Sequence, residues 1–223
     1  MVCGIRRLGK GLRSGPPEGG HYVSGAVHMK RVLIVTVVVL VSIISLSAQG
    51  GGQPTCRNCP STYVPKDELQ AYINRAIARN IVDQQVRAVD VGRMNVGVAV
   101  IYRGRLASPA QNSVAEHHQV SEVYHIIEGT ATIATGGELV GAQSRPADSD
   151  SVRLLNGPGS NAASIRNPVL TDLKAGDVIV IPAGTGHWFT KIDDHITYLM
   201  IRLDPDQIVP LKDQAASRAD LAR

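Results

Sequence analysis

The feature that most constrains the fold is a succession of short runs, beginning at Ile81, in which apolar and polar side chains alternate. Turn-forming residues such as Gly136 and Gly137 separate the runs, and no helical pattern lies between them. Several strands without intervening helices favour an antiparallel sandwich or barrel. The sequence therefore predicts an all-β domain over residues 81–205. The expected strands are residues 82–91, 96–102, 113–120, 122–134, 138–142, 177–181 and 196–203.

An amphipathic helix is expected directly ahead of the strands, over residues 65–80. Leu69, Ile73 and Ile77 recur on one face, acidic residues stand in the first turn, and arginines gather toward the end. This arrangement suits both the helical period and the helix dipole. We expect the helix to pack on the sheet, and packing on a partner subunit is the alternative.

Two further segments lack the strand pattern. Residues 143–172 are rich in Ser, Asn, Pro and Gly, and a polar stretch of this length in a compact β domain is either a lid over a site or disordered. Residues 206–223 form a charged, helix-like tail that we expect at the surface.

The N-terminal part has the pattern of a secretory signal over residues 29–48. Lys30 and Arg31 precede an uncharged apolar run, and small residues follow it up to Ala48. We predict cleavage near Ala48 and a secreted or periplasmic protein with no stable membrane association afterwards. The alternative is a retained membrane anchor, although the run is at the short end for crossing a bilayer. Residues 1–28 lack apolar periodicity, and we interpret them as a misassigned upstream extension.

Residues 49–64 are a linker rich in Gly and Pro that contains two cysteines, Cys56 and Cys59. A C-x-x-C sequence forms a redox pair, half of a zinc site or a simple disulfide. No second C-x-x-C exists and no thioredoxin-like pattern surrounds this one. In an exported protein we therefore expect a local disulfide.

The charge balance argues against nucleic acid as a partner. Of the 23 basic and 19 acidic residues, six basic and one acidic residue lie in residues 1–48, which leaves 17 and 18 for residues 49–223 and a net charge of −1. The part after the predicted cleavage is therefore nearly neutral, with no basic patch and no interleaved aromatic residues.

Two stretches carry the candidate chemistry. In residues 116–129, Glu116, His118 and Glu122 have the spacing to share one face of a strand that turns and runs on. In residues 176–187, an apolar run ends at a Pro-Ala-Gly turn just before His187. Imidazoles and carboxylates that converge inside a β-barrel would bind a divalent metal ion. The predicted ligands are Glu116, His118, Glu122 and His187.

These stretches resemble the two motifs of the cupin superfamily, G-x5-H-x-H-x3-4-E-x6-G and G-x5-P-x-G-x2-H-x3-N. His118-x3-Glu122-x6-Gly129 is similar to the end of the first motif. Gly176-x5-Pro182-x-Gly184-x2-His187 is similar to the second motif up to its histidine. The resemblance covers about residues 82–203 and implies a double-stranded β-helix, the jelly-roll barrel, preceded here by the helix.

Three positions depart from the family pattern. Glu116 stands where the first family histidine is usual, Ala110 replaces a glycine, and Lys191 replaces the final asparagine. The fourth ligand is therefore open. Glu116 would give a site of two histidines and two carboxylates, whereas His117, brought inward by a bulge, would give a three-histidine site. Strand alternation favours Glu116, because His117 and the residue after it should face opposite ways.

Four other side chains near these motifs have weaker assignments. Tyr124 and Phe189 share the strand parity of Glu122 and His187, which predicts an aromatic wall of a substrate pocket, although core packing explains them equally well. His125 has the opposite parity from Glu122, and a second histidine follows two aspartates at an expected turn. We interpret His125 and His195 as structural.

The resemblance implies a small-molecule or saccharide substrate and one divalent transition metal, with Fe, Cu or Mn expected and Zn or Ni as alternatives. Members of the family include oxidases, oxygenases, decarboxylases, lyases and isomerases, so the fold does not fix the reaction. The leading hypothesis is an exported oxidoreductase, and the rival is a non-catalytic module that binds a small molecule or sugar. The resemblance also implies a homodimer. No catalytic residue follows from the sequence.

Overall fold

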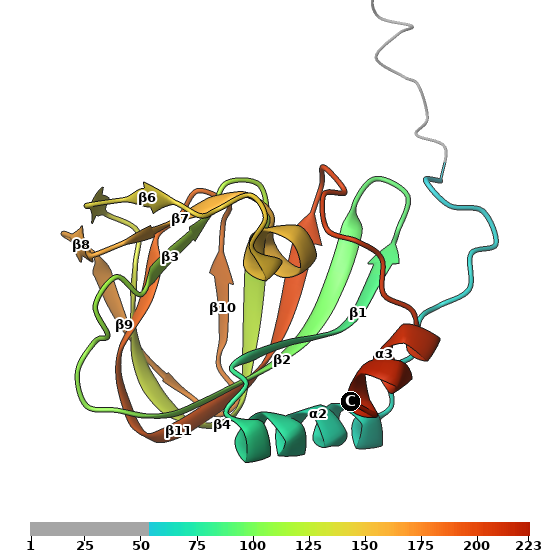
Figure 1. Cartoon of the computed structure of the whole chain (residues 1–223), viewed down its shortest axis with the longest axis horizontal. Coiled ribbons are helices and arrows are strands. Elements are labelled where there is room, and N and C mark those ends of the chain that lie inside the picture. Colours follow the sequence, from blue (N-terminus) through green and yellow to red (C-terminus); the bar gives the residue numbers. More distant parts are fainter. Residues whose placement is uncertain (1–53) are drawn as a thin grey trace, which may run out of the picture. The chain divides into compact units, whose positions relative to one another are not determined.

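The structure, a computed structural model, describes residues 54–223, so the expected extension 1–28 and signal 29–48 lie outside the described residues. Most strands of this part join one nine-stranded sheet, and Figure 1 shows them curving around a common interior. The predicted all-β barrel is thereby confirmed.

Within residues 54–223, no helix is both long and apolar enough to span a bilayer. The strands are β1 (Asp83–Asp90), β2 (Asn95–Leu106), β3 (Val114–His117), β4 (Ser121–Thr135), β5 (Glu138–Val140), β6 (Gln143–Ser144), β7 (Gly159–Ala162), β8 (Ser164–Arg166), β9 (Val169–Lys174), β10 (Val178–Ile181) and β11 (His187–Asp204).

Strand β11 is a central strand of the barrel sheet. It pairs antiparallel with β2 on one side and with β4 on the other. Its first residue, His187, also pairs with Ala115 of β3. Register shifts between Ile192 and Ile196 bend the strand, so a single strand serves two parts of the sheet. The expected strand 196–203 is the second half of β11, and the first half was missed because polar residues interrupt its apolar pattern.

The barrel interior is apolar and comes mainly from β2, β4 and β11. Alternate residues of these strands point inward, as the period of two requires. With one Phe and one Trp in the chain, aliphatic and tyrosine side chains fill most of this space. The buried cluster comprises Ala99, Ile101, Tyr124, Ile126, Ala131, Ile133, Leu173, Ile181, Phe189, Ile192, Ile196, Tyr198 and Met200.

Of the two alternatives for the polar segment 143–172, the structure shows an ordered segment and not a disordered one, and several of its residues line the cavity described below. It contains β6 to β9 and a π-helix, η1 (Ser151–Asn156), which Figure 1 shows as a short orange helix at the upper ends of the strands. Strand β7 pairs with β3, and β9 pairs with β4. These strands are two to six residues long. Their few polar side chains carry no readable alternation, so pairing with neighbours decides their conformation.

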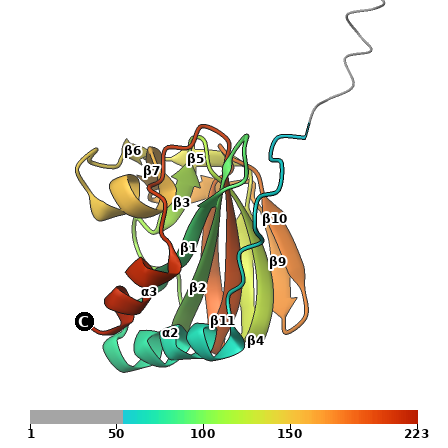
Figure 2. The ribbon, with the colours of Figure 1, turned by 90° about the vertical axis from the view of Figure 1, so that its right-hand side faces the viewer.

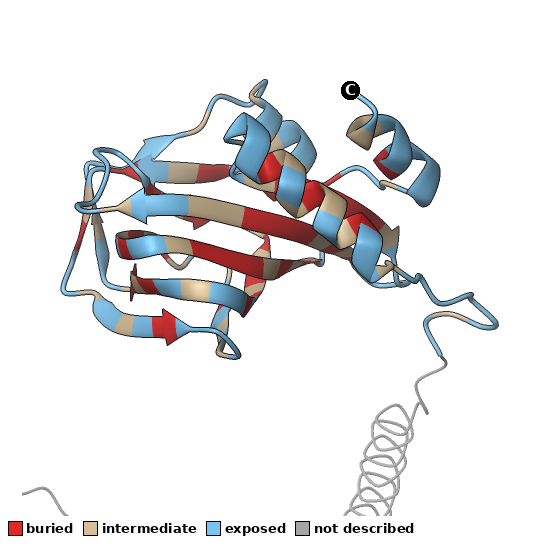
Figure 3. Cartoon of the chain, turned by 90° about the horizontal axis from the view of Figure 1, so that it is seen from below, coloured by how far each residue is buried: buried red, intermediate tan, exposed pale blue. Residues whose placement is uncertain are grey.

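The predicted helix 65–80 is confirmed as α2 (Lys66–Arg79). Figure 3 shows α2 lying across the outer face of the sheet, and the buried residues of this helix are Glu68, Tyr72 and Ala76. The C-terminal tail contains a second helix, α3 (Gln214–Leu221), which Figure 2 shows beside α2. The expected surface tail is therefore anchored, and Ser217 of α3 is fully buried.

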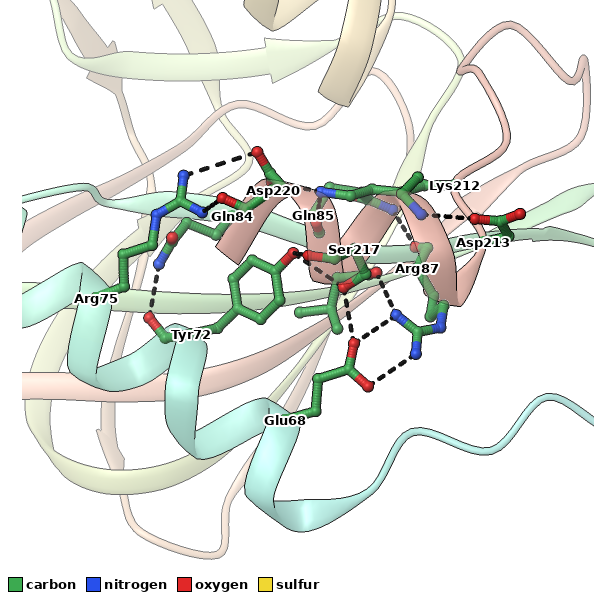
Figure 4. A network of polar contacts seen from close by, with 12 residues as sticks. Glu68, Tyr72, Arg75, Gln84, Gln85, Arg87, Lys212, Asp213, Ser217 and Asp220 are labelled. Atoms are coloured by element: carbon green, nitrogen blue, oxygen red, sulfur yellow. Dashed lines mark hydrogen bonds and ion pairs between the residues drawn. The ribbon is translucent and has the colours of Figure 1, made fainter. Parts of the chain in front are cut away.

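A buried polar network joins α2, β1 and α3 (Figure 4). Arg87 of β1 donates two hydrogen bonds to the Glu68 carboxylate of α2, at 2.7 and 2.8 Å. The Ser217 hydroxyl donates to the same carboxylate at 2.8 Å and is 2.9 Å from the Tyr72 hydroxyl. Burial raises the pKa of the Glu68 carboxyl, but the hydrogen bond from Arg87 is the larger effect and holds that pKa below its usual value. The carboxylate is thus ionised, paired and enclosed.

Replacement of the carboxylate by Glu68→Gln should lower the free energy of unfolding at neutral pH by about 3 kcal/mol, because it leaves Arg87 buried without its partner. The folded-state pKa of Glu68 is depressed, so its contribution exists above the unfolded-state pKa and is lost as the pH falls through the folded-state pKa. Urea unfolding from neutral to acid pH measures this difference, which should shrink in acid. The control is Glu138→Gln, since Glu138 pairs with Arg166 in solvent and should contribute roughly 0 to 1 kcal/mol. A pH-independent difference for Glu68→Gln would contradict the assignment.

Candidate metal centre

Three buried side chains converge at one end of the barrel: His117, Glu122 and His187. One donor atom from each lies within 4.8 Å of the others. The Nε2 atom of His117 is 3.3 Å from Glu122 Oε1, and the Nε2 atom of His187 is 3.5 Å from Glu122 Oε2. The three residues lie at the end of β3, at the start of β4 and at the start of β11, and both β3 and β4 pair with β11.

The turn before β11 fixes this convergence. The Gly184 N–H donates a hydrogen bond of 2.7 Å to the His117 carbonyl, which ties the Pro-Ala-Gly turn to the end of β3. Gly184 has φ of +77°, a backbone conformation that favours glycine. His187 follows three residues later and enters the sheet opposite Ala115. The spacing Pro182-x-Gly184-x2-His187 therefore has a structural cause.

The structure brings together two of the four predicted ligands and leaves the other two apart. Glu122 and His187 lie in the group, but Glu116 and His118 lie outside it, and their side chains contact each other at 3.3 Å. The His118 side chain is 48% exposed. Strand β3 ends at His117 and the chain bends at residues 118 and 119 before β4 begins, so alternation does not carry across. The alternative residue, His117, is the one that faces Glu122, and the bend brings it there without a bulge in the β3–β7 register.

The Glu122 carboxylate is the electrostatic centre of the group. Burial by itself raises the pKa of this carboxyl. The hydrogen bond from His117 acts in the opposite direction, as does the positive charge of Arg202, and such contacts hold the pKa well below its usual range. The Tyr124 hydroxyl donates to Glu122 Oε2 at 2.6 Å, and burial raises the pKa of that hydroxyl. Glu122 is therefore an ionised acceptor that all of its neighbours stabilise.

The orientation of His187 suits a cation. Its Nδ1 atom lies 3.1 Å from the Thr185 carbonyl, which can only accept, so the Nδ1 atom carries the proton. Burial lowers the pKa of His187 to about 4, so the ring is neutral at neutral pH. The Nε2 lone pair then faces a carboxylate oxygen of Glu122 at 3.5 Å. A positive ion between these two acceptors would be favourable, and a neutral imidazole beside a carboxylate is a donor set that divalent transition metals bind.

His117 is held differently, by a residue of the polar segment. The Arg145 Nη1 atom lies 3.1 Å from His117 Nδ1. A guanidinium only donates, so the Nδ1 atom accepts and the Nε2 atom of the ring carries the proton toward Glu122 in this arrangement. A metal bound at Nε2 would replace that proton and require Arg145 to release the Nδ1 atom. Arg145 thus competes with a metal for His117.

A cavity of about 360 Å³ opens beside the group. Tyr124 lines this cavity, whereas Phe189 lines a neighbouring cavity of about 230 Å³, and the two rings are separated by Tyr198. His125 is exposed on β4, and His195 stacks on Tyr102 at 5.9 Å. The full lining of the larger cavity is Asp83, Arg103, Ala115, His117, Glu122, Tyr124, Arg145, Pro146, Ser149, Ser151, Asn156, Asn161, His187 and Met200.

Sequence reasoning missed most of the polar residues of the cavity. Arg145 and Asn156 come from the segment expected to be a lid or disordered, and Asp83 and Arg103 come from β1 and β2. One signal in the sequence could have identified His117: with four residues between the second histidine and the glutamate, the first motif also fits as Ala115-x-His117-x4-Glu122-x6-Gly129. In that alignment Ala115 takes the place of the first histidine.

Comparison with known proteins yields one family and several distant structures. The model of a family described as Cupin matches residues 80–219. A search of curated proteins found no match.

Similar solved structures include a protein from Bacillus halodurans, with 16% identity, a TM-score of 0.36 and coverage of 73% of this chain and 97% of that chain. Peruvianin-I, a cysteine peptidase from Thevetia peruviana latex, has 15% identity, a TM-score of 0.33 and coverage of 58% and 67%. A recombinant oxalate oxidase in complex with glycolate has 12% identity, a TM-score of 0.32 and coverage of 72% and 64%. Likeness at this level indicates no substrate and no reaction.

The two adjacent histidines of β3 and its bend provide a matched pair of variants. His117→Ala should abolish the uptake of a divalent transition metal, because it removes one of three buried donors. His118→Ala should leave uptake unchanged within about twofold, since this side chain is half exposed and outside the group. Titration of metal-free protein with Mn²⁺ or Zn²⁺, followed by calorimetry, measures both. Loss of uptake in His118→Ala with retention in His117→Ala would refute the geometry and restore the set expected from alternation.

Proposed function

The chain belongs to the cupin family, and on this premise we propose that it is an exported metal-dependent enzyme of the oxidoreductase type. Its substrate would be a small oxygenated molecule or a saccharide. The observation that carries the proposal is the buried group of His117, Glu122 and His187 on the wall of the cavity of about 360 Å³. A pocket that combines potential metal ligands with space for a small molecule is where such chemistry takes place in proteins.

The donor set limits the range of metals that the site would bind but does not identify one of them. Two imidazoles and one carboxylate suit Fe, Cu or Mn, and also Zn or Ni. Three protein donors leave positions open for a substrate or for water, and a bound redox-active ion would supply electron transfer or Lewis-acid polarisation there.

The protein residues prepare the site in defined ways. Glu122 is kept ionised by its neighbours, and the Thr185 carbonyl orients His187 so that the Nε2 atom is free to bind. The Tyr124 hydroxyl occupies one lone pair of Glu122 Oε2 and thereby limits the directions in which this carboxylate can bind. Each of these contacts is the kind of supporting hydrogen bond that fixes ligand orientation.

Export is part of the proposal and receives support from the linker. Cys56 and Cys59 are joined as a disulfide. Disulfides persist mainly in oxidising compartments outside the cytosol, which agrees with a signal over residues 29–48. We also propose a secreted or periplasmic location without stable membrane association after cleavage. A homodimer remains a proposal from the family resemblance.

The mature N-terminus tests the export proposal. Expression of the full chain in a bacterial host should yield protein whose intact mass corresponds to a start near Gln49, because the small residues before this point suit signal cleavage. A variant with a blocked cleavage site, Ala48→Arg, should retain the segment and sediment with membranes. Wild-type protein that retains residues 29–48 and sediments with membranes would establish a membrane anchor instead.

A second candidate function has specific support. Ala115 lies opposite His187, where the alternative alignment of the first motif places a histidine, and Arg145 occupies the Nδ1 atom of His117. A site with one donor fewer and a competing cation would suit a non-catalytic module that binds a small molecule or sugar. Such a module would show saturable binding without product.

Elemental analysis separates the two candidates. Protein beginning at residue 49, purified without a chelating tag, should contain about one equivalent of iron, copper or manganese for the one donor group found in residues 54–223. His187→Ala should lose the metal together with any substrate-dependent dioxygen consumption, and His195→Ala, a change outside the group, should retain both. Absence of metal from the wild type, with none taken up on titration, would overturn the enzyme proposal in favour of the binding module.

A further inference from the structure

The cavity beside the donor group contains an arginine without a carboxylate partner. Arg103 of β2 donates through Nε to the Tyr198 hydroxyl at 3.4 Å, and its guanidinium carbon lies 5.1 Å from the centre of the Phe189 ring. Within residues 54–223, no ion pair joins it to an acidic side chain. Burial lowers the pKa of Arg103, but the neighbouring Tyr198, Tyr124 and Asp83 raise it above its usual value, so the group stays charged. Its remaining donors are available to a ligand.

A second guanidinium faces the same cavity in a prepared position. Arg145 donates through Nε to Asn161 Oδ1 at 2.8 Å and through Nη2 to the Ser160 carbonyl at 3.0 Å. Gly159 permits this approach, because a Cβ atom there would lie 2.6 Å from Arg145 Nη1. Its hydrogen-bond partners within residues 54–223 are an amide oxygen, a backbone carbonyl and the ring nitrogen of His117. The charge of Arg145 is therefore positioned but not paired with an acid.

The acidic residues that line the cavity are already engaged. Asp83 pairs through its Oδ2 atom with Arg202, whose side chain is buried. Glu122 interacts with the two histidines of the donor group. A metal ion at that group would add positive charge. The charge left for a ligand is therefore positive, and buried charge of this kind calls for an anion.

Two residues that line the cavity, Asn156 and Asp83, each contain a buried acceptor atom without a donor among residues 54–223. The Asn156 Oδ1 and Asp83 Oδ1 atoms are buried and have no hydrogen-bond partner within the described part of the chain. Asn156, the last residue of η1, is only 8% exposed. An unpartnered acceptor in a polar cavity is satisfied by a donor from water or from a bound molecule, and the oxygens of an ionised anionic group cannot supply that donor. Hydroxyl groups can.

We propose that this cavity binds a polyhydroxylated anion, such as a sugar acid, with Arg103 and Arg145 on the anionic group and Asn156 and Asp83 accepting from hydroxyls. The volume of about 360 Å³ lies within the range of small-molecule pockets and is large enough for a single sugar ring. This inference rests on the proposed function, because it names the substrate class of the same site. A carboxylate and a phosphate share the anionic chemistry, so the experiment includes both.

Calorimetric titration of the metal-loaded protein with four probes tests the proposal. D-Galacturonate carries the carboxylate and the hydroxyls, D-galactose lacks the charge, cyclohexanecarboxylate lacks the hydroxyls, and D-galactose 6-phosphate replaces the carboxylate by a phosphate. We expect one of the two charged sugars to bind at least about tenfold more tightly than either galactose or cyclohexanecarboxylate, the effect of losing one hydrogen bond to a charged group or more. The order of the two charged sugars identifies the anionic group.

Two variants and one control assign the contacts. Arg103→Gln should weaken the charged sugars at least about tenfold and leave galactose unchanged, whereas Asn156→Ala should weaken both sugars by about threefold to tenfold and leave cyclohexanecarboxylate unchanged. Arg166→Gln removes an exposed arginine paired with Glu138 and should leave the binding of all four probes unchanged.

Metal content measured on the same samples separates the two proposals. Preferential binding of a charged sugar to protein that takes up no metal would support the anion site and refute the metalloenzyme. Full metal content with equal binding, or no binding, of all four probes would overturn the anion site.

Discussion

One buried carboxylate, Glu122, is the charge around which the site and its scaffold are arranged. An ionised carboxylate at 1% exposure is costly unless positive or hydrogen-bonding groups surround it. His117, His187 and Tyr124 supply them from the cavity side, and Arg202 lies 3.7 Å away on the other side. The same requirement explains why the site would accept a cation between Glu122 and the two imidazoles.

Arg202 connects Glu122 to the neighbouring strands of the sheet. It is the cross-strand partner of Glu122, and its guanidinium contacts Asp83 and, at 2.5 Å, Gln85 Oε1 on β1. Gly97 makes room for the arrangement, because a Cβ atom there would lie 2.5 Å from Gln85 Nε2. The charges of the site and the pairing of β1, β2, β11 and β4 are thus parts of one buried network, and they are expected to be lost together on unfolding.

The polar segment between β5 and β10 gives the cavity its particular chemistry. It contributes Arg145, which contacts His117, and Asn156, whose Oδ1 atom has no hydrogen-bond donor within the described residues. Its short strands hold these residues by pairing with β3 and with each other. A barrel with a common arrangement of strands can therefore present a different ligand surface through one inserted segment, as expected where function resides in sites built onto a shared fold.

The sequence by itself determined the elements that repeat: the alternating strands, the amphipathic helix α2, and the turn that delivers His187. It also selected Glu122 and His187, because their spacing follows from strand pairing and a tight turn. Tertiary structure decided which neighbour joins them. Strand alternation favoured Glu116 and His118 as ligands, but the bend after His117 ends the alternation between inward-facing and outward-facing residues. Such a bend is fixed by tertiary contacts and not by the local sequence pattern. One of these contacts is the hydrogen bond of 2.9 Å from the His118 N–H to the Pro158 carbonyl. The same holds for Arg145 and Asn156: no period places them, since only the packing of β6, η1 and β7 against the barrel brings them to the cavity.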